Sequence, residues 1–162
     1  MEIIETNNLD EAQTQAVLTL WNDEYPSQLS FDTVTEFSNY LSAQEQIKHF
    51  LLLDQHQITG WAITFKRQSA SWFVLIIASS MHHKGMGTLL LNKLKTTETV
   101  LNGWMVDHNE YTRPNDVKYH SPVAFYLKNG FTVCGQSRLE LPHLSAVQIT
   151  YSSAPPEDFD CK

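Results

Sequence analysis

The chain has few cysteines and few basic residues, and each shortage removes a class of protein from consideration. Its two cysteines, Cys134 and Cys161, lie far apart and fit no metal-binding spacing, so we expect reduced thiols and no metal site. Lysine and arginine together number 11 against 18 acidic residues, which gives a net charge of −7. Because nucleic-acid-binding proteins normally present a basic face, we expect no nucleic-acid partner.

Long apolar segments are also missing. No stretch is long enough to cross a bilayer, and the amino terminus lacks the basic-then-apolar pattern of a secretory signal. We therefore expect a soluble, cytoplasmic protein with no membrane partner. The length suits one domain, over residues 1–152, followed by a mobile tail at 153–162 that contains Pro155-Pro156 and three acidic residues.

Hydrophobic periodicity predicts alternating strands and helices. Strands are expected at residues 2–5, 48–54, 58–66, 73–77, 104–106, 131–141 and 147–151. Two amino-terminal helices should begin after Asn8 and Ser30, with a polar loop at 22–26 between them. A third helix is expected from Met86 to about Lys95, and a fourth at 122–128, with Ser121 as its N-cap. Residues 107–120 should form a long loop.

The segment His82-His83-Lys84-Gly85-Met86-Gly87 is the most informative part of the chain. It lies between the apolar strand and the third helix, so its backbone N–H groups should converge at a positive helix end, where diphosphate can bind. Two glycines before a helix are more often plain turn chemistry. The spacing fits neither a Walker loop nor a three-glycine dinucleotide fingerprint.

About forty residues later the chain reads Phe125-Tyr126-x-Lys128-x-Gly130-Phe131. Together with His82-x-x-Gly85-x-Gly87, this segment resembles the GNAT superfamily of acyl-CoA-dependent N-acetyltransferases. The resemblance covers about residues 70–131, and both motifs occur in the expected order. Two departures are His82, where arginine or glutamine is usual, and Ser79, where proline is frequent.

The resemblance implies an α/β fold in a single domain. Its central sheet would be mixed but mostly antiparallel, with one splayed parallel strand pair and about four flanking helices. Acetyl-CoA would be the acyl donor, with its pantetheine arm between the two splayed strands and its diphosphate on the glycine loop. The implied cofactor-binding residues are Ile76, Ile77, His82, His83, Lys84, Gly85, Met86, Gly87, Thr88, Ser121 and Phe125. Lys84 could equally be a solvated lysine, and Phe125 a core residue.

Tyr126 is the catalytic candidate. The family places a tyrosine hydroxyl here beside the sulfur of coenzyme A, where it can protonate a leaving thiolate as a general acid. The competing interpretation is a core tyrosine that packs its helix against the sheet. A general base is harder to name, because Asp107, Glu24 and the loop residues His108, Glu110 and His120 are all chemically able to act and all typical of solvated loops.

Two classes of function remain open at this level. One is an N-acetyltransferase that transfers an acetyl group from acetyl-CoA to a primary amine of a small molecule or peptide. The other is a non-catalytic acyl-CoA-binding module or sensor on the same fold. In either case we expect a monomer or a homodimer, and we expect the acceptor side to be formed by residues 107–120 together with residues 22–25.

Overall fold

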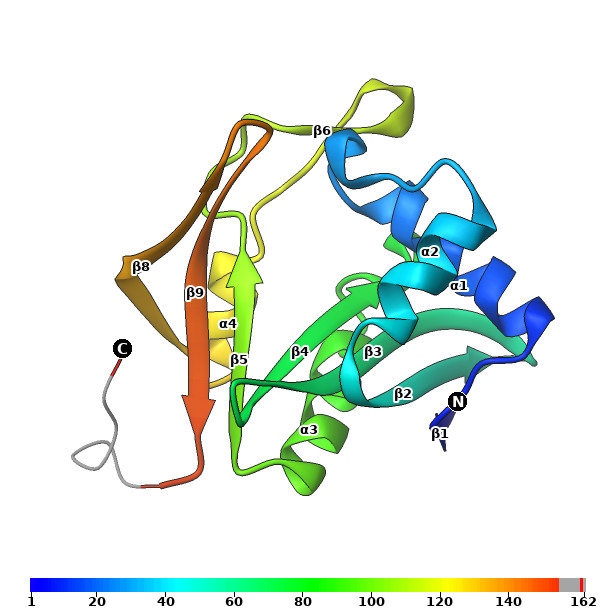
Figure 1. The fold of residues 1–162 in the computed structure, drawn as a ribbon, viewed down its shortest axis with the longest axis horizontal. Helices are drawn as coiled ribbons and strands as arrows, with labels where there is room; N and C mark the ends of the chain where they lie inside the picture. The colour runs from blue at the N-terminus through cyan, green and yellow to red at the C-terminus, as the bar shows by residue number, and fades with distance from the viewer. Residues whose placement is uncertain (155–160, 162) are drawn as a thin grey trace.

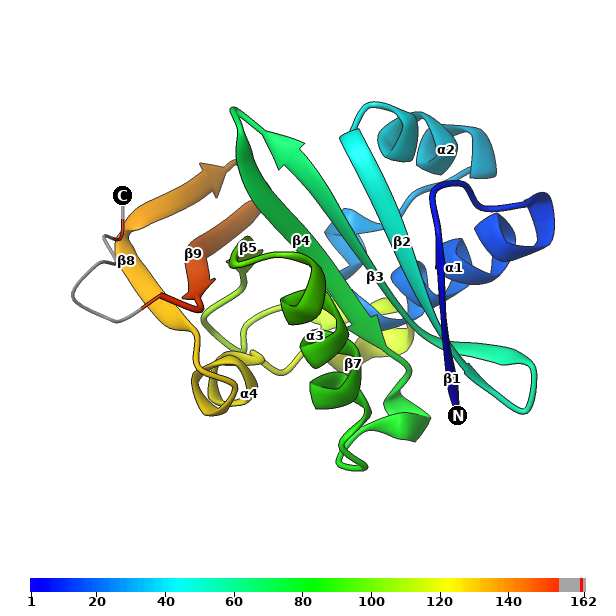
Figure 2. The ribbon, with the colours of Figure 1, turned by 90° about the horizontal axis from the view of Figure 1, so that it is seen from below.

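In the computed structural model of the chain, a central sheet separates two pairs of helices (Figures 1 and 2). The structure describes residues 1–154 and 161. The seven strands of the sheet follow the order β1-β2-β3-β4-β5-β9-β8, and every neighbouring pair is antiparallel except β4 and β5. The strands are β1 (Glu2–Thr6), β2 (Glu45–Asp54), β3 (Gln57–Arg67), β4 (Ala70–Ile77), β5 (Val100–Met105), β8 (Thr132–Leu141) and β9 (Leu144–Ser152).

Four α-helices and a small hairpin complete the described part of the chain. The helices are α1 (Glu11–Glu24), α2 (Val34–Ser42), α3 (Met86–Thr97) and α4 (Val123–Lys128). The hairpin pairs β6 (Thr112–Arg113) with β7 (Val117–Lys118) inside the segment expected to be a plain loop. The expected fold class, with one splayed parallel pair and about four helices, is confirmed.

Alternation along the strands supplies a hydrophobic core on each face of the sheet. One core joins α3 and α4 to the sheet through residues such as Leu90, Phe73 and Phe131. The other joins α1 and α2 through residues such as Trp21 and Trp61. Because β4 contributes to both cores, its apolar run is nearly continuous, as predicted from the sequence.

Helix caps differ from the sequence-based expectation. Asp10, and not Asn8, caps α1: its Oδ1 accepts a hydrogen bond from the N–H of Gln13 at 2.7 Å, and the Gln13 side chain accepts one from Asp10 N–H. Thr33, and not Ser30, caps α2. Because the capped α1 continues to Glu24, the predicted polar loop at 22–26 is mostly the last turn of a helix.

Ser121 does not cap α4. Its hydroxyl donates to the carbonyl of Val106 at 2.6 Å, and its N–H donates to Asn109 Oδ1 at 2.7 Å. Pro122 takes the N-cap position and makes no side-chain cap hydrogen bond. Ser121 therefore ties the start of α4 to the end of β5, which fixes how the helix approaches the sheet.

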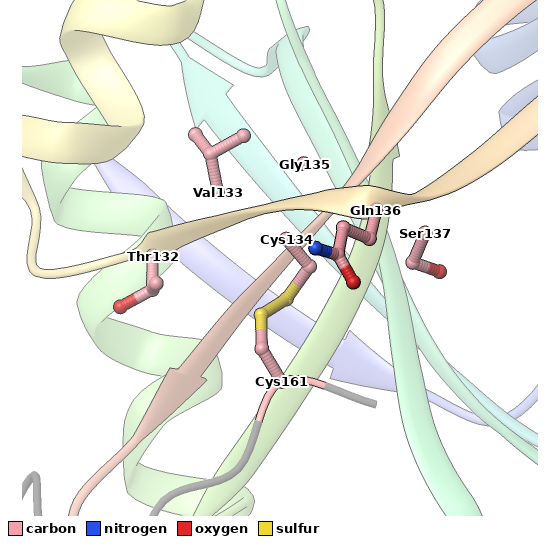
Figure 3. A pocket seen from close by; sticks show the side chains of 7 residues that line it. All are labelled: Thr132, Val133, Cys134, Gly135, Gln136, Ser137 and Cys161. Atoms are coloured by element: carbon pink, nitrogen blue, oxygen red, sulfur yellow. A yellow bond between two sulfur atoms is a disulfide. The ribbon is translucent and has the colours of Figure 1, made fainter.

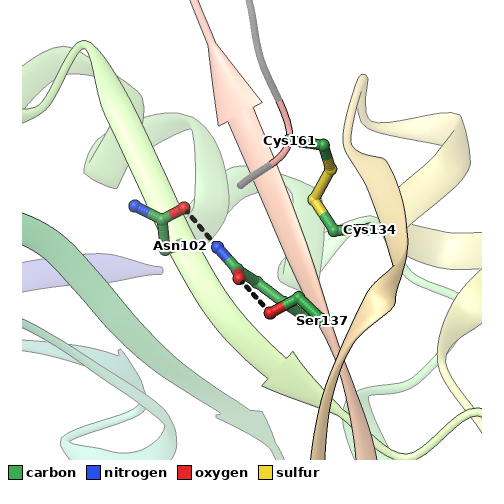
Figure 4. Close-up of a disulfide and its surroundings, with 5 residues drawn as sticks. Asn102, Cys134, Ser137 and Cys161 are labelled. Carbon is green, nitrogen blue, oxygen red and sulfur yellow. Dashed lines mark hydrogen bonds between the residues drawn. A yellow bond between two sulfur atoms is a disulfide. The ribbon is translucent and has the colours of Figure 1, made fainter.

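The two cysteines form a disulfide, so the prediction of free thiols is wrong (Figure 4). Cys134 lies just before a bulge in β8 at residues 135–137, and the tail returns so that the Cα of Cys161 is 5.5 Å from that of Cys134. The disulfide helps line a pocket of about 420 Å³ at this bulge (Figure 3). Residues 155–160 and 162, on which the predicted mobility of the tail depends, lie outside the described residues.

None of the helices in the described part of the chain combines the length and the apolar composition that a bilayer crossing requires.

A histidine is buried in the core beneath α1 and α2. His49 is 3% exposed, and its Nδ1 accepts a hydrogen bond from Trp61 Nε1 at 3.2 Å. Burial lowers the pKa of His49 to about 4, because the charged ring would lose its hydration. The imidazole is therefore neutral in the folded protein at neutral pH.

We expect His49 to make the protein sensitive to mild acid. Between pH 6.5 and about 4 the unfolded chain binds a proton at His49 and the folded chain does not, so stability falls as the pH falls through this window. The full effect is about 3 kcal/mol of the free energy of unfolding. Urea unfolding at pH 7 and pH 4 measures it. His49→Gln should lose less stability over this interval than the wild type, whereas His143→Gln, at an exposed histidine, should behave like the wild type. Equal losses in all three proteins would contradict the assignment.

Candidate active site

The parallel strands β4 and β5 are joined at one place only, where Trp72 pairs with Asn102. Beyond this point they diverge toward their carboxyl ends (Figure 1). The glycine loop follows β4, and residues 107–120 follow β5, so both loops leave the sheet at the same edge. In α/β proteins such an edge, at the carboxyl ends of strands, is a frequent ligand site.

The divergence leaves part of the β4 backbone without a strand partner. Ala78 N–H donates to Thr59 O at 2.8 Å, and hydrogen-bonded pairs alternate along an antiparallel ladder. Ile76 therefore bonds toward β3, where it faces Trp61, while the backbone groups of Leu75 and Ile77 point toward β5. Because β5 has moved away there, Leu75, and not the predicted Ile76, is the neighbour of Ile77 on the free edge.

The first turn of α3 presents further unpaired donors. Gly85 occupies the N-cap with φ of +78°, a left-handed conformation that favours glycine, and it offers no side chain to cap the helix. Leu89 N–H bonds to Gly85 O, whereas the N–H groups of Met86, Gly87 and Thr88 precede the first intrahelical bond. These three donors, with the positive end of the helix, form a candidate anion site.

Gly87 has a packing role that the sequence did not reveal. A Cβ atom at this position would lie 2.9 Å from Cε1 of Phe125, so only glycine allows that ring to rest against α3. At Gly85, by contrast, an added Cβ would meet nothing within 4 Å. Phe125 therefore fills the space where a side chain at position 87 would lie, whereas the corresponding space at Gly85 is open.

His82 bonds back to the end of β4. Its Nε2 lies 2.9 Å from the carbonyl oxygen of Ile77. The ring therefore occupies one of the acceptors on the free β4 edge and fixes the start of the glycine loop. His83 and Lys84 are exposed at the tip of the loop, and His83 has a positive φ of 61°.

Tyr126 is buried in the aromatic core next to the diverging strands. Its ring packs at 5.9 Å from that of Phe73 and 5.3 Å from that of Phe131. Its hydroxyl makes no hydrogen bond to any residue that the structure describes. Burial, with a smaller contribution from the phenol of Tyr119, raises the pKa of Tyr126 well above its ordinary value, so the hydroxyl stays protonated.

Two other tyrosines accompany Tyr126. Tyr25 follows the last turn of α1, and Tyr119 follows β7. Burial raises the pKa of Tyr119 to about 12, and burial together with the neighbouring phenols of Tyr119, Tyr126 and Tyr40 raises that of Tyr25 well above its ordinary value. The phenols of Tyr25, Tyr119 and Tyr126 thus influence one another although they come from three separate segments.

The two carboxylates predicted as bases are both held in ion pairs. Asp107 accepts from both Nη atoms of Arg138, at 2.8 and 3.1 Å, and this contact lowers the pKa of Asp107. Glu24 accepts from the N–H and Oγ of Ser79 and from Arg113 Nη1. The contact with Arg138 therefore makes Asp107 a weaker proton acceptor.

The remaining base candidates lie on the 107–120 segment. The ring of His108 meets that of Tyr111 edge to face, with centroids 4.4 Å apart, and its Nδ1 accepts from Glu110 N–H at 3.2 Å. Glu110 and His120 are exposed. Arg113 and Leu75, which the sequence analysis did not single out, are functional candidates that only the folded arrangement reveals.

Comparison with solved structures identifies the fold. No protein-family model matches the sequence, and no curated protein matches it. An aminoglycoside 6'-N-acetyltransferase complexed with coenzyme A superposes with a TM-score of 0.72 at 14% identity, over 96% of this chain and 98% of that one. A ribosomal-protein-alanine N-acetyltransferase from Brucella melitensis gives 0.64 at 16% identity, over 94% and 99%. A putative phosphinothricin N-acetyltransferase gives 0.67 at 13% identity, over 95% and 100%. The resemblance read from the two motifs is thus confirmed for the fold: the chain has the fold of the GNAT acetyltransferases.

Proposed function

We propose that the protein is an acetyl-CoA-dependent N-acetyltransferase that acetylates a primary amine of a small molecule or peptide. The observation that carries the proposal is the divergence of β4 from β5 beside the uncapped first turn of α3. An extended ligand with amide groups and an anionic end suits this pair of features. The solved structures of the same fold support the proposal, since one of them is complexed with coenzyme A.

The residues present fit such a ligand. The N–H groups of Met86, Gly87 and Thr88 would hold the diphosphate, and the exposed Lys84 and His83 would flank it. The free N–H and C=O of Leu75 and the free N–H of Ile77 would bond to the pantetheine amides as an added strand does. When bound, acetyl-CoA supplies an acetyl group activated as a thioester.

Tyr126 is the proposed proton donor. Its hydroxyl is held protonated by burial and has no competing partner among the described residues, so it is available to a departing thiolate. The raised pKa also means that ionisation of Tyr126 should not limit activity at neutral or mildly alkaline pH.

For the acceptor side, we propose the 107–120 segment together with the last turn of α1. Tyr25 and Tyr119 would contact the amine from these two elements. Asp107 and Glu24 change role in this proposal: because each is held by an arginine, they shape the acceptor side.

A negative charge introduced at position 85 tests the proposed diphosphate site. Asparagine and aspartate both tolerate the left-handed backbone at this position, so Gly85→Asn and Gly85→Asp differ chiefly by one negative charge. We expect Gly85→Asp to bind coenzyme A about tenfold more weakly than Gly85→Asn in calorimetry, with similar thermal unfolding. The difference should shrink as salt is added. Equal affinities of the two variants would place the diphosphate elsewhere.

Removal of the Tyr126 hydroxyl tests the chemistry. Tyr126→Phe should lower the turnover of an acetylated amine by roughly a hundredfold, the usual effect of losing a general acid, and leave coenzyme A affinity unchanged. Tyr40→Phe is the matched control, because burial also raises the pKa of Tyr40, to about 12, within the other core. Thiol release measured over a panel of amines provides the readout. Tyr126→Phe with wild-type turnover would make Tyr126 a packing residue, and coenzyme A binding without turnover on any amine would favour a binding module.

A further inference from the structure

Arg113, on β6, joins three segments that are distant in the sequence. Its Nη1 donates to Glu24 Oε2 at 3.1 Å, to Ser79 Oγ at 2.8 Å and to the carbonyl of Asp23 at 3.4 Å. The two charged side chains are 20% and 13% exposed, so water screens their attraction less than that of a surface pair. One guanidinium thus connects the 107–120 segment to both α1 and the residues after β4.

Ser79 extends the connection toward the glycine loop. Its N–H and Oγ donate to the Glu24 carboxylate at 3.0 and 2.6 Å. It also begins the short 3-10 turn Ser79–Met81, which leads directly into His82. The same carboxylate therefore fixes the start of the glycine loop and, through Arg113, the β6 hairpin.

Helix stability does not explain this cluster. Asp23 and Glu24 lie in the last turn of α1, which contains no basic residue, and acidic groups at a helix carboxyl end are unfavourable. Arg113 offsets that cost from 89 positions away in the chain. Because Arg113 and Glu24 are so far apart in the sequence, their contact stabilises the relative position of the two segments that carry them.

The 107–120 segment is held from two sides at the adjacent residues Tyr111 and Thr112. Near α1, Ser27 Oγ donates to the carbonyl of Thr112 at 3.1 Å, and Figure 1 shows β6 beside the connection between α1 and α2. On the other side, the hydroxyl of Tyr111 accepts from Ser145 N–H at 2.8 Å, at the start of β9. The segment consequently bridges the two halves of the sheet across the carboxyl ends of β4 and β5. Tyr119 is fixed within it by its N–H bond to Tyr111 O.

We propose that Arg113 is a positioning residue that holds the 107–120 segment against α1 and so sets the acceptor side of the site. The role of Arg113 in acceptor binding rests on the proposed acetyltransferase function, whereas its role in holding the hairpin does not depend on that function. Arg113 acts through Tyr119 and the hairpin and does not itself touch the reacting atoms. Without it, the one hydrogen bond left between the hairpin and the α1–α2 connection in the described part of the chain is that from Ser27 to Thr112, so the hairpin should move more freely.

The test compares Arg113→Met, which keeps the stem and removes the donors, with Arg113→Lys and with Lys128→Met, a matched loss of an exposed cation outside the 107–120 segment. In Arg113→Met, hydrogen exchange of the amides in residues 107–120 should accelerate by about tenfold or more, while α2 and β2 keep wild-type exchange. The KM for the acceptor should rise about tenfold, with kcat within about threefold and coenzyme A affinity unchanged. Arg113→Lys should recover part of both effects, and Lys128→Met should show neither.

Exchange separates this proposal from the proposed function, because it is measured on the protein alone. If no amine is acetylated by the wild type, the acetyltransferase proposal fails and the exchange data still decide the role of Arg113. Wild-type exchange in Arg113→Met, or acceleration spread equally over α2 and β2, would overturn the positioning role. A fall in kcat with an unchanged acceptor KM would overturn it as well.

Discussion

The whole site depends on how β4 and β5 are held together at one end and kept apart at the other. Their backbones pair only at Trp72 and Asn102, so side chains must complete the joint. On one face the rings of Trp72 and Trp104 lie 5.3 Å apart. On the other, the ring of Phe73 lies over Gly103, where a Cβ would come within 2.8 Å of it. Aromatic packing therefore replaces the missing ladder, and the strands can diverge without loss of the core.

This joint explains why the sheet tolerates unpaired backbone groups near its centre. Partners for buried N–H and C=O groups are almost always present in native proteins, and Leu75 and Ile77 lack a strand partner on the β5 side. The His82 ring satisfies one of these groups, the Ile77 carbonyl, from within the chain. The others suit a ligand that adds to the edge of β4. The aromatic packing that joins β4 to β5 thus also leaves the edge of β4 free for the proposed ligand.

Sequence patterns predicted the parts of this arrangement that depend on short spacing. The glycine loop, the apolar run of β4 and the α4 motif are each contained within about a dozen residues, so periodicity and turn chemistry identify them. Contacts between distant residues were not predictable. Nothing in the sequence pairs Arg113 with Glu24 or Arg138 with Asp107, and the choice of Leu75 over Ile76 follows from the register with β3. The disulfide was missed for the same reason, because Cys161 approaches Cys134 only in the fold.

The central claim is that one ligand lies along the free edge of β4 and ends at the first turn of α3. Amide chemical shifts recorded by NMR while coenzyme A is added test it most directly. We expect large shifts for Leu75, Ile77, Gly87 and Thr88, and a small shift for Ile76, whose N–H bonds to β3. Shifts confined to other parts of the sheet, or a shift at Ile76 as large as that at Ile77, would contradict it.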